Sequence, residues 1–371
     1  MDVLGTPGLA GHEQVTFFSD PQSGLRAIVA IHDTTLGPAI GGCRMWPYAS
    51  EEAALRDVLR LASGMTYKAA MARVPFGGGK TVVFGDPRKD KTEALLRALG
   101  RAIEGLGGRY YTGEDVGTSP ADMDLVGEET AYALGRSRGG SGDPSPLTAR
   151  GVWIGIQAAV RHRLKREDLQ GIRVAIQGLG HVGYALARLL SQDGAELIVA
   201  DLDPMLAERA ALEFKARVVA PEAVMGVEAE VLAPCALGSV INDLTVPFLN
   251  CAIVAGAANN QLLEARYGAA LRARGILYAP DYVINAGGVI NIAQELHPAG
   301  YDRQRALARV NEIGSTLREI FERADQERLP TDQIADRMAE GRLGAARQAR
   351  ALGARAGQEA IVPTRRAAVA G

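Results

Sequence analysis

The sequence predicts an α/β protein with two domains, a mixed sheet in the first and a doubly wound parallel sheet in the second. Beyond about residue 150, short apolar runs alternate with helical patterns, which is typical of a parallel sheet. Before that point, consecutive strand-like runs at 15–18 and 25–31 favour a mixed sheet. The stretch 136–146 is rich in glycine and proline, and we interpret it as the hinge between the two parts.

A chain of 371 residues is long enough for two domains, each with its own core. We expect a first domain at 1–140, a second at 147–330, and a C-terminal helical segment at 331–371 that packs back on the first domain. A cleft between the two domains is then the expected place for an active site.

Charge and cysteine usage narrow the class of protein. The 41 basic and 43 acidic residues nearly cancel, which argues against a nucleic-acid or membrane partner. Cys43, Cys235 and Cys251 are far apart and form no CxxC, so neither a disulfide framework nor a metal site is indicated and a reducing cytoplasm is expected. The N-terminus has no export signal pattern, and no run of about 18 apolar residues occurs.

The first domain continues with a glycine-rich apolar stretch and a helix. Residues 37–46 hold too many glycines for a regular element and are too apolar for a solvated loop, so we expect irregular backbone pressed against another part of the protein. Ser50 then caps a helix that has Glu51 and Glu52 in its first turn. That helix ends near Lys68, which on its own is compatible with a solvated partner of the helix dipole.

Lys80 follows three glycines and precedes an apolar strand. A lysine held at the mouth of a strand among glycines is partly desolvated, which lowers its pKa toward catalytic use. The alternative is a phosphate-binding loop, because Gly79, Lys80 and Thr81 match the end of that motif. Val74 stands where the motif requires its first glycine, which disfavours the alternative.

Two acids follow the next strand-like run, at 109–112. Glu114 and Asp115 come directly after it, and acids just beyond a strand end in an α/β sheet lie where ligands bind. Their position alone is equally compatible with plain loop carboxylates.

Residues 172–203 have the pattern of a dinucleotide-binding βαβ unit. An apolar run leads into Gly178, Gly180 and Gly183, which allow a tight turn, a close approach of backbone to a pyrophosphate, and close packing of helix and strand. Asp201 ends the second strand and can bind a ribose hydroxyl, while Leu202 offers no cation for a 2′-phosphate, so we expect NAD rather than NADP. The cofactor-binding residues expected here are Gly178, Leu179, Gly180, His181, Val182, Gly183 and Asp201.

The remainder continues this alternation. A strand at 252–254 ends near Asn259 and Asn260, on the cofactor side of a parallel sheet. Gly287 and Gly288 open another helix, and long helical patterns follow at 303–326 and 331–350. We expect the end of the chain beyond Gly353 to be frayed.

Several ordered blocks resemble the glutamate/leucine/phenylalanine/valine dehydrogenase family, and most closely its leucine-specific branch. They are GPAIGGCRMW, GMTYK, PFGGGKTVVFGDPRKDK, TGEDVGT, GSGDPSPLTARGV, GLGHVG, APCALG, AGAANNQL and YAPDYVINAGGVIN. The resemblance implies a Rossmann-type NAD-binding domain and reversible oxidative deamination of an L-amino acid to a 2-oxo acid and ammonia. It also implies a homo-oligomer, an octamer or a dimer.

The resemblance further implies roles for individual residues. Lys68 would bind the substrate carboxylate, Lys80 would activate water, and Asp115 would move protons to and from the amine. Asn260, rather than Asn259, would touch both the substrate and the nicotinamide ribose. We further assign Gly41 and Met65 to substrate binding and Thr148 to the cofactor.

Family precedent gives the side-chain pocket the walls Ile40, Gly113, Val289 and Ile292. Val289 and Asn291 resemble the leucine enzymes, whereas Gly113 resembles the phenylalanine enzymes. Because one methyl group changes discrimination by only about 1–3 kcal/mol, we expect a branched-chain aliphatic substrate and keep an aromatic amino acid, phenylalanine or tryptophan, as the alternative. None of these positions holds a lysine for a second carboxylate, which disfavours glutamate. A non-catalytic NAD-binding regulator is the remaining alternative.

Overall fold

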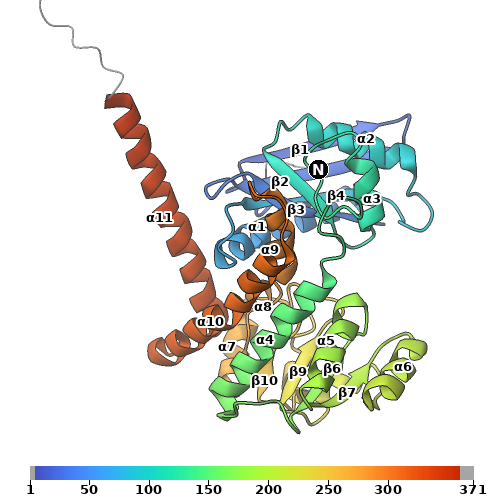
Figure 1. Ribbon diagram of the computed structural model, residues 1–371, viewed down its shortest axis with the longest axis vertical. Helices are drawn as coiled ribbons and strands as arrows, with labels where there is room; N and C mark the ends of the chain where they lie inside the picture. Colours follow the sequence, from blue (N-terminus) through green and yellow to red (C-terminus); the bar gives the residue numbers. More distant parts are fainter. Residues whose placement is uncertain (1–4, 360–371) are drawn as a thin grey trace, which may run out of the picture.

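The computed structural model describes residues 5–359, with side chains to residue 352. Two lobes, each built on its own sheet, lie one above the other in Figure 1, and helices α9 and α10 lie where they meet. A five-stranded sheet has the order β1-β2-β4-β3-β5, and a six-stranded sheet has the order β11-β10-β9-β6-β7-β8. None of the described helices combines the length and apolar character that a bilayer crossing requires.

The first sheet is mixed, as expected. β1 and β4 pair antiparallel with β2, whereas β3 pairs parallel with β4 and β5. The elements of this lobe are β1 (Gln14–Asp20), β2 (Leu25–Asp33), β3 (Ala39–Trp46), α1 (Glu51–Met71), β4 (Gly77–Phe84), α2 (Glu93–Glu104), β5 (Tyr110–Glu114) and α3 (Pro120–Val126). Alternate residues of β2 pack toward α2 and toward α1, so this central strand is buried on both faces.

The glycine-rich stretches form regular strands, so two expectations were wrong. The stretch expected to be irregular is β3, and Lys80 lies inside β4 rather than at its mouth. Glycine is needed for close packing instead: a Cβ at Gly41 would lie 1.8 Å from the Gly79 carbonyl oxygen, and one at Gly78 would lie 2.1 Å from the Thr66 nitrogen. A phosphate-binding loop is excluded, because these glycines belong to a hydrogen-bonded strand.

The second sheet is parallel throughout, and its order places β6 at the centre with the next strands on either side. This is the doubly wound order of dinucleotide-binding domains, with a crevice at the carboxyl ends of the central strands. Its strands are β6 (Arg173–Gln177), β7 (Glu196–Ala200), β8 (Arg217–Val218), β9 (Val231–Pro234), β10 (Ile253–Val254) and β11 (Leu277–Tyr278). Its helices are α4 (Ser145–Leu164), α5 (His181–Gln192), α6 (Pro204–Phe214), α7 (Arg266–Ala273), α8 (Asp281–Ile284), α9 (Gly287–Ala293) and α10 (Arg303–Glu327).

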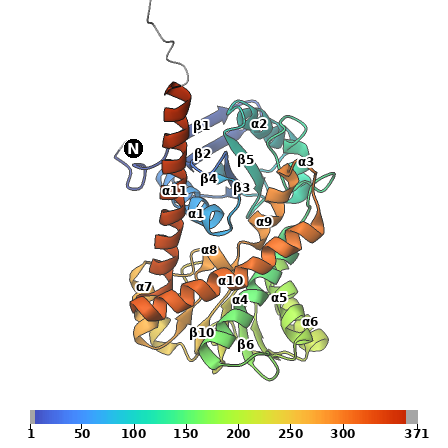
Figure 2. The same cartoon turned by 60° about the vertical axis from the view of Figure 1, so that its left-hand side comes forward.

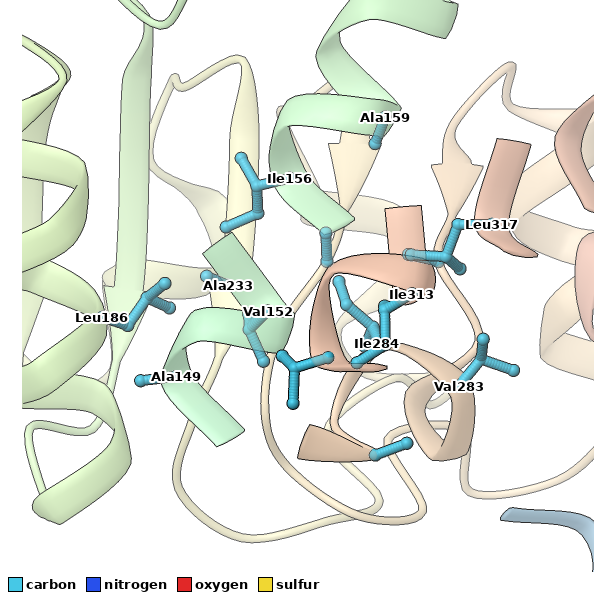
Figure 3. Packing of buried hydrophobic residues seen from close by; sticks show 14 of the residues in the cluster. Ala149, Val152, Ile156, Ala159, Leu186, Ala233, Val283, Ile284, Ile313 and Leu317 are labelled. Atoms are coloured by element: carbon cyan, nitrogen blue, oxygen red, sulfur yellow. The ribbon is translucent and has the colours of Figure 1, made fainter. Parts of the chain in front are cut away.

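The largest apolar core lies where α4 packs between the second sheet and the short helices that lead to α10. Val152 and Ile156 of α4 are fully buried, and Ile284 and Ile313 approach them from α8 and α10 (Figure 3). A Cβ at Gly155 would lie 2.4 Å from Ile284, so glycine lets these helices approach closely. Tight packing of this kind fixes α8 and α9, which carry residues of the site.

Helix α11 (Thr331–Glu359) runs beside α1, so the last described helix packs on the first lobe (Figure 2). Arg342 donates to the Ala70 carbonyl oxygen at 2.9 Å, and Arg347 pairs with Asp33 at 2.5 Å. The helix continues past Gly353, where we expected fraying, since its alanine- and arginine-rich sequence favours helix. Residues 360–371, to which that expectation also applied, lie outside the described residues.

Candidate active site

A cavity of about 630 Å³ lies between the two lobes, beside the first half of β3 and at the carboxyl ends of β5 and of the central strands of the second sheet. Every residue assigned from the sequence to catalysis or substrate binding lines it: Ile40, Gly41, Met65, Lys68, Lys80, Gly113, Asp115, Asn260, Val289 and Ile292. Of the residues assigned to the cofactor, Thr148, Gly180, His181, Val182 and Asn260 line it as well. Gly178, Leu179, Gly183 and Asp201 are not among its lining residues, so the cavity meets the glycine turn at Gly180, His181 and Val182.

Lys80 and Asp115 form a direct ion pair. The Lys80 ammonium lies 2.7 Å from an Asp115 carboxylate oxygen, and the Lys80 side chain is only 7% exposed. The two residues come from β4 and from the end of β5, with β3 between them. Contact across β3 requires Gly42, because a Cβ there would lie 2.7 Å from the Asp115 Cβ and 3.3 Å from the Lys80 Nζ. Sequence analysis assigned Gly42 no role.

Arg44 is a second cation on Asp115 that sequence analysis missed. Its Nε donates to the Asp115 carboxylate at 3.2 Å, and its Nη1 lies 3.1 Å from Asp57, which also accepts the Tyr48 hydroxyl at 2.7 Å. Burial alone would raise the pKa of Asp115, but the charges of Lys80 and Arg44 outweigh burial and hold the pKa well below its usual range. Asp115 is therefore ionised throughout the neutral and alkaline range.

Lys68 reaches across the cleft to the second lobe. Its ammonium donates to the side-chain oxygen of Asn259 at 3.1 Å, and Asn285 donates to the same oxygen at 2.8 Å. The direct partner of Lys68 in this structure is thus Asn259, while Asn260 lines the cavity beside it with a positive φ of 52°. Burial lowers the pKa of Lys68 to about 8.

Glu114 adds a carboxyl group whose protonation state is poised near neutrality. It lines the cavity beside Asp115, and burial, reinforced by the charges of Asp143 and Asp115, raises its pKa to about 7. The cleft therefore holds two carboxyl groups whose pKa values are shifted in opposite directions. Near pH 7, Asp115 is ionised and Glu114 is about half protonated.

The turn between β6 and α5 fits a dinucleotide. Gly178 has a φ of +95°, and a Cβ at Gly183 would lie 2.0 Å from the Gly178 carbonyl oxygen, so both positions require glycine. A Cβ at Gly180 would meet nothing within 4 Å, which leaves room for phosphate in front of α5. No side chain caps α5, so its first N–H groups are available to an anion.

Asp201 holds this turn from the end of β7. Its carboxylate accepts the backbone N–H of Leu179 at 2.5 Å and that of Asp203 at 2.8 Å, while the Leu179 side chain is buried in the core. Leu202 is 88% exposed and presents no charge. This end of β7 thus presents a carboxylate, the group that binds ribose hydroxyls in dinucleotide sites, followed by an uncharged residue.

Apolar residues form another part of the cavity wall. Ile40 comes from β3, Gly113 from β5, and Val289 and Ile292 from α9. A Cβ at Gly113 would lie 3.6 Å from the Ile292 Cδ1, which is ordinary contact, so glycine leaves space for about one methyl group. A dinucleotide turn, two lysines, a carboxylate and an apolar pocket in one cleft define a dehydrogenase for a small substrate that has a carboxylate and an apolar side chain.

Comparison with known proteins identifies the family. Residues 12–132 match the model described as "Glu/Leu/Phe/Val dehydrogenase, dimerisation domain", and 139–209 with 203–351 match "Glutamate/Leucine/Phenylalanine/Valine dehydrogenase". The chain belongs to the Glu/Leu/Phe/Val dehydrogenase family and is an amino-acid dehydrogenase.

Similar proteins are known in several branches of this family. A leucine dehydrogenase from Geobacillus stearothermophilus is 54% identical over 91% of this chain and 92% of its own. An L-tryptophan dehydrogenase from Nostoc punctiforme is 48% identical over 90% of this chain and 94% of its own. The crystal structure of L-tryptophan dehydrogenase from that organism superposes with a TM-score of 0.77 at 46% identity, covering 91% of this chain and 97% of that one.

Proposed function

We propose that the protein catalyses the reversible NAD-dependent oxidative deamination of a branched-chain L-amino acid, leucine, valine or isoleucine, to the 2-oxo acid and ammonia. The observation that carries the proposal is the cleft itself. It brings two lysines and a carboxylate together with the apolar walls Ile40, Val289 and Ile292 in one cavity. Leucine dehydrogenases from several bacilli are 51–54% identical to this chain over more than 90% of its length, which supports a branched-chain substrate.

The polar residues divide the chemistry among them. The Lys68 ammonium binds the α-carboxylate of the substrate and fixes the α-carbon in the cleft. The Lys80 Nζ takes a proton from the water that attacks the substrate imine, and its charged form stabilises the carbinolamine that results. Asp115 exchanges protons with the amine, and its contact with Lys80 at 2.7 Å gives the two groups a direct path for proton transfer. Burial of the pair excludes unwanted solvent.

NAD is the proposed cofactor, and when bound it accepts the hydride from the α-carbon of the substrate. The residues proposed to hold it are the backbone of Gly178 to Gly183, with the carboxylate of Asp201 on the ribose hydroxyls. Thr148 and Asn260 line the same cavity and would hold the nicotinamide half. The N-terminus of α5 would attract the pyrophosphate.

An aromatic substrate is the second candidate, and Gly113 is the observation that favours it. Glycine leaves the pocket larger by about one methyl group in front of Ile292. Related L-tryptophan and phenylalanine dehydrogenases are 48% identical to this chain. The walls Ile40, Val289 and Ile292 offer no charge to a second carboxylate, which disfavours glutamate.

We propose a homo-oligomer, an octamer or a dimer, in a reducing cytoplasm. The family model that matches residues 12–132 describes a dimerisation domain, which supports assembly through the first lobe. Cys43, Cys235 and Cys251 are all free thiols, which supports the reducing compartment.

A substrate panel tests the function. NADH formation is followed at alkaline pH with NAD and L-leucine, L-valine, L-isoleucine, L-phenylalanine, L-tryptophan or L-glutamate, and kcat/KM is compared. The branched-chain substrates are expected to give the highest values. Lys80→Ala is expected to abolish turnover while NAD binding persists. Absence of turnover by the wild type with every amino acid would favour a non-catalytic NAD-binding protein instead.

A further inference from the structure

Asp281 is a carboxylate in the cleft to which neither sequence motifs nor the proposed chemistry assigned a role. It is the first residue of α8 and lines the cavity from the second lobe, opposite Lys68 of the first. Its carboxylate accepts the backbone N–H of Gln261 at 2.7 Å and that of Tyr282 at 2.6 Å. Both carboxylate oxygens are therefore held in place.

The hydrogen bond from the Gln261 N–H to Asp281 fixes the loop that carries Asn259, the partner of Lys68. Gln261 is fully buried, and its side-chain nitrogen donates to the carbonyl oxygens of Gly256 at 2.8 Å and Ala258 at 3.1 Å. Asn259 lies inside this closed loop and presents its side-chain oxygen to the Lys68 ammonium at 3.1 Å. Asp281 thus anchors the end of the loop through Gln261 and thereby sets the position of the Asn259 oxygen.

Asp281 also acts on Lys68 through its charge. Three charged groups near the cleft influence the pKa of Lys68: Asp281 from α8, Lys80 from β4 and Asp115 from the end of β5. Lys80 and Asp115 largely neutralise each other as an ion pair, so Asp281 is the principal anion acting on Lys68. Burial lowers the pKa of Lys68 to about 8, and Asp281 opposes that fall more strongly than any other charge.

Burial and the groups around Asp281 act on its pKa in opposite directions. Burial is the larger influence and raises the pKa of Asp281 above its usual value, while the Gln261 N–H, Lys68 and the Tyr282 N–H oppose that rise. The other titratable groups near Asp281 are Tyr278, Tyr282, Asp332 and Asp336. Two backbone donors and the Lys68 ammonium stabilise the negative form and so limit the rise caused by burial.

We propose that Asp281 is a positioning residue, which holds the Asn259 loop against Lys68 and supplies the negative charge that keeps Lys68 protonated for the substrate carboxylate. The inference rests on the proposed function, in which Lys68 binds that carboxylate. It adds a residue of the second domain to the control of carboxylate binding by the first domain. Substrate affinity at alkaline pH is then a property of both domains.

The test measures carboxylate binding against pH in the full-length protein saturated with NADH. The probe is 4-methylpentanoate, which has the carbon skeleton of leucine without the amine, and its Kd is determined by calorimetry between pH 6 and 9.5. In the wild type, binding weakens above pH 8 as Lys68 loses its proton. Asp281→Asn replaces the charge with a neutral side chain of the same shape, and Asp281→Ser is a second neutral variant in case the first does not fold.

Both neutral variants are expected to lose affinity at lower pH than the wild type. If the pH midpoint of the loss of affinity falls by one unit from about 8, the Kd of the variant exceeds that of the wild type about eightfold at pH 8.5 and by about 10% at pH 6. Asp336→Asn is the matched control, because Asp336 accepts the Tyr282 hydroxyl at 2.7 Å and is not among the charges that face Lys68. Asp281→Glu is expected to retain the wild-type midpoint.

Three results decide the question. The role of Asp281 is overturned if a folded neutral variant keeps the wild-type pH midpoint of binding. It is also overturned if Asp336→Asn shifts that midpoint as much as the Asp281 variants do. The role is supported if Asp281→Asn or Asp281→Ser lowers the pH midpoint while Asp281→Glu and Asp336→Asn keep the wild-type midpoint. Failure of the wild type to oxidise any amino acid contradicts the proposed function instead, while the calorimetric comparison still decides whether Asp281 controls carboxylate binding.

Discussion

Replacing Gly42 with alanine is expected to separate Lys80 from Asp115. An added Cβ would lie 2.7 Å from the Asp115 Cβ, 2.7 Å from the Glu114 carbonyl oxygen and 3.3 Å from the Lys80 Nζ. Gly42 lies within strand β3, a conformation that alanine readily adopts, so the effect acts through space rather than through the local backbone. Two of these atoms, the Asp115 Cβ and the Glu114 carbonyl oxygen, come from the end of β5, next to the carboxylate that we propose to be catalytic.

The magnitude follows from the overlap. Non-bonded carbon atoms settle at about 3.5–4.0 Å, so the Asp115 side chain and its backbone must move by about 1 Å. A misplacement of about 1 Å at a reacting group costs about 100-fold in rate, equivalent to about 2.7 kcal/mol in the activation free energy. The free energy of unfolding is expected to fall by about 1–3 kcal/mol, because the substitution overpacks a buried sheet.

The assay compares kcat for L-leucine oxidation with the KM for NAD. Gly42→Ala is expected to lower kcat about 100-fold with little change in the KM for NAD, since the cofactor turn lies in the other lobe. Gly64→Ala is the control, because Gly64 lines the same cavity from α1 and a Cβ there would meet nothing within 4 Å. A Gly42→Ala enzyme with wild-type kcat, or an equal loss in Gly64→Ala, would refute the reasoning.

Three further predictions concern specificity, pH and the cofactor. Gly113→Ala adds a methyl group 3.6 Å from Ile292, so the kcat/KM ratio of leucine to phenylalanine should rise about 10- to 200-fold in a two-substrate assay. Arg44→Met removes a positive charge that lowers the pKa of Asp115, so the pKa of Asp115 should rise. In a pH profile of kcat, the fall on acidification should therefore begin at a higher pH than in the wild type. At pH 9, kcat should change less than it does at acidic pH. Asp201→Ala removes the proposed ribose ligand, so the KM for NAD should increase about tenfold or more and the preference for NAD over NADP should narrow.

The second domain was predictable because its signals are local. Strand, turn, helix and the acid at Asp201 all fall within residues 172–203, and the reason for each glycine is contained in that same unit. Strand alternation then predicted a parallel sheet, and the structure confirms the mixed and parallel sheets of the two lobes.

The glycine-rich strands of the first domain were misread because the reason for their glycines is not local. Gly41 in β3 faces Gly79 in β4, and Gly78 faces Thr66 in α1, so each glycine is required by a neighbour that is distant in the sequence. Glycine is depleted in strands in general, and the pattern alone therefore indicates a loop. A second observation, such as a strand-like alternation of charge and apolarity in residues 43–46, could have indicated β3.

The same distance explains the site residues that were missed. Arg44 and Asp115 are 71 positions apart, and Lys68 and Asn259 are 191 positions apart. No spacing rule links residues so far apart in the chain, whereas motifs found Lys68, Lys80 and Asp115 one at a time. Arg44 did carry a weak signal, since it follows Gly42 on the same face of a strand.

The two lysines of the cleft differ in where their partners come from. Lys80 is paired with Asp115 of its own domain, so the pair persists whatever the separation of the domains. Lys68 depends on Asn259 and Asp281 of the other domain, and burial between the domains lowers its pKa to about 8. If the two domains were to separate about the stretch 136–146, Lys68 would lose both this burial and these partners, and its pKa would return toward its ordinary value. The ion pair proposed for catalysis is thus complete within one domain, whereas the charge proposed to bind the substrate carboxylate depends on the contact between the two domains.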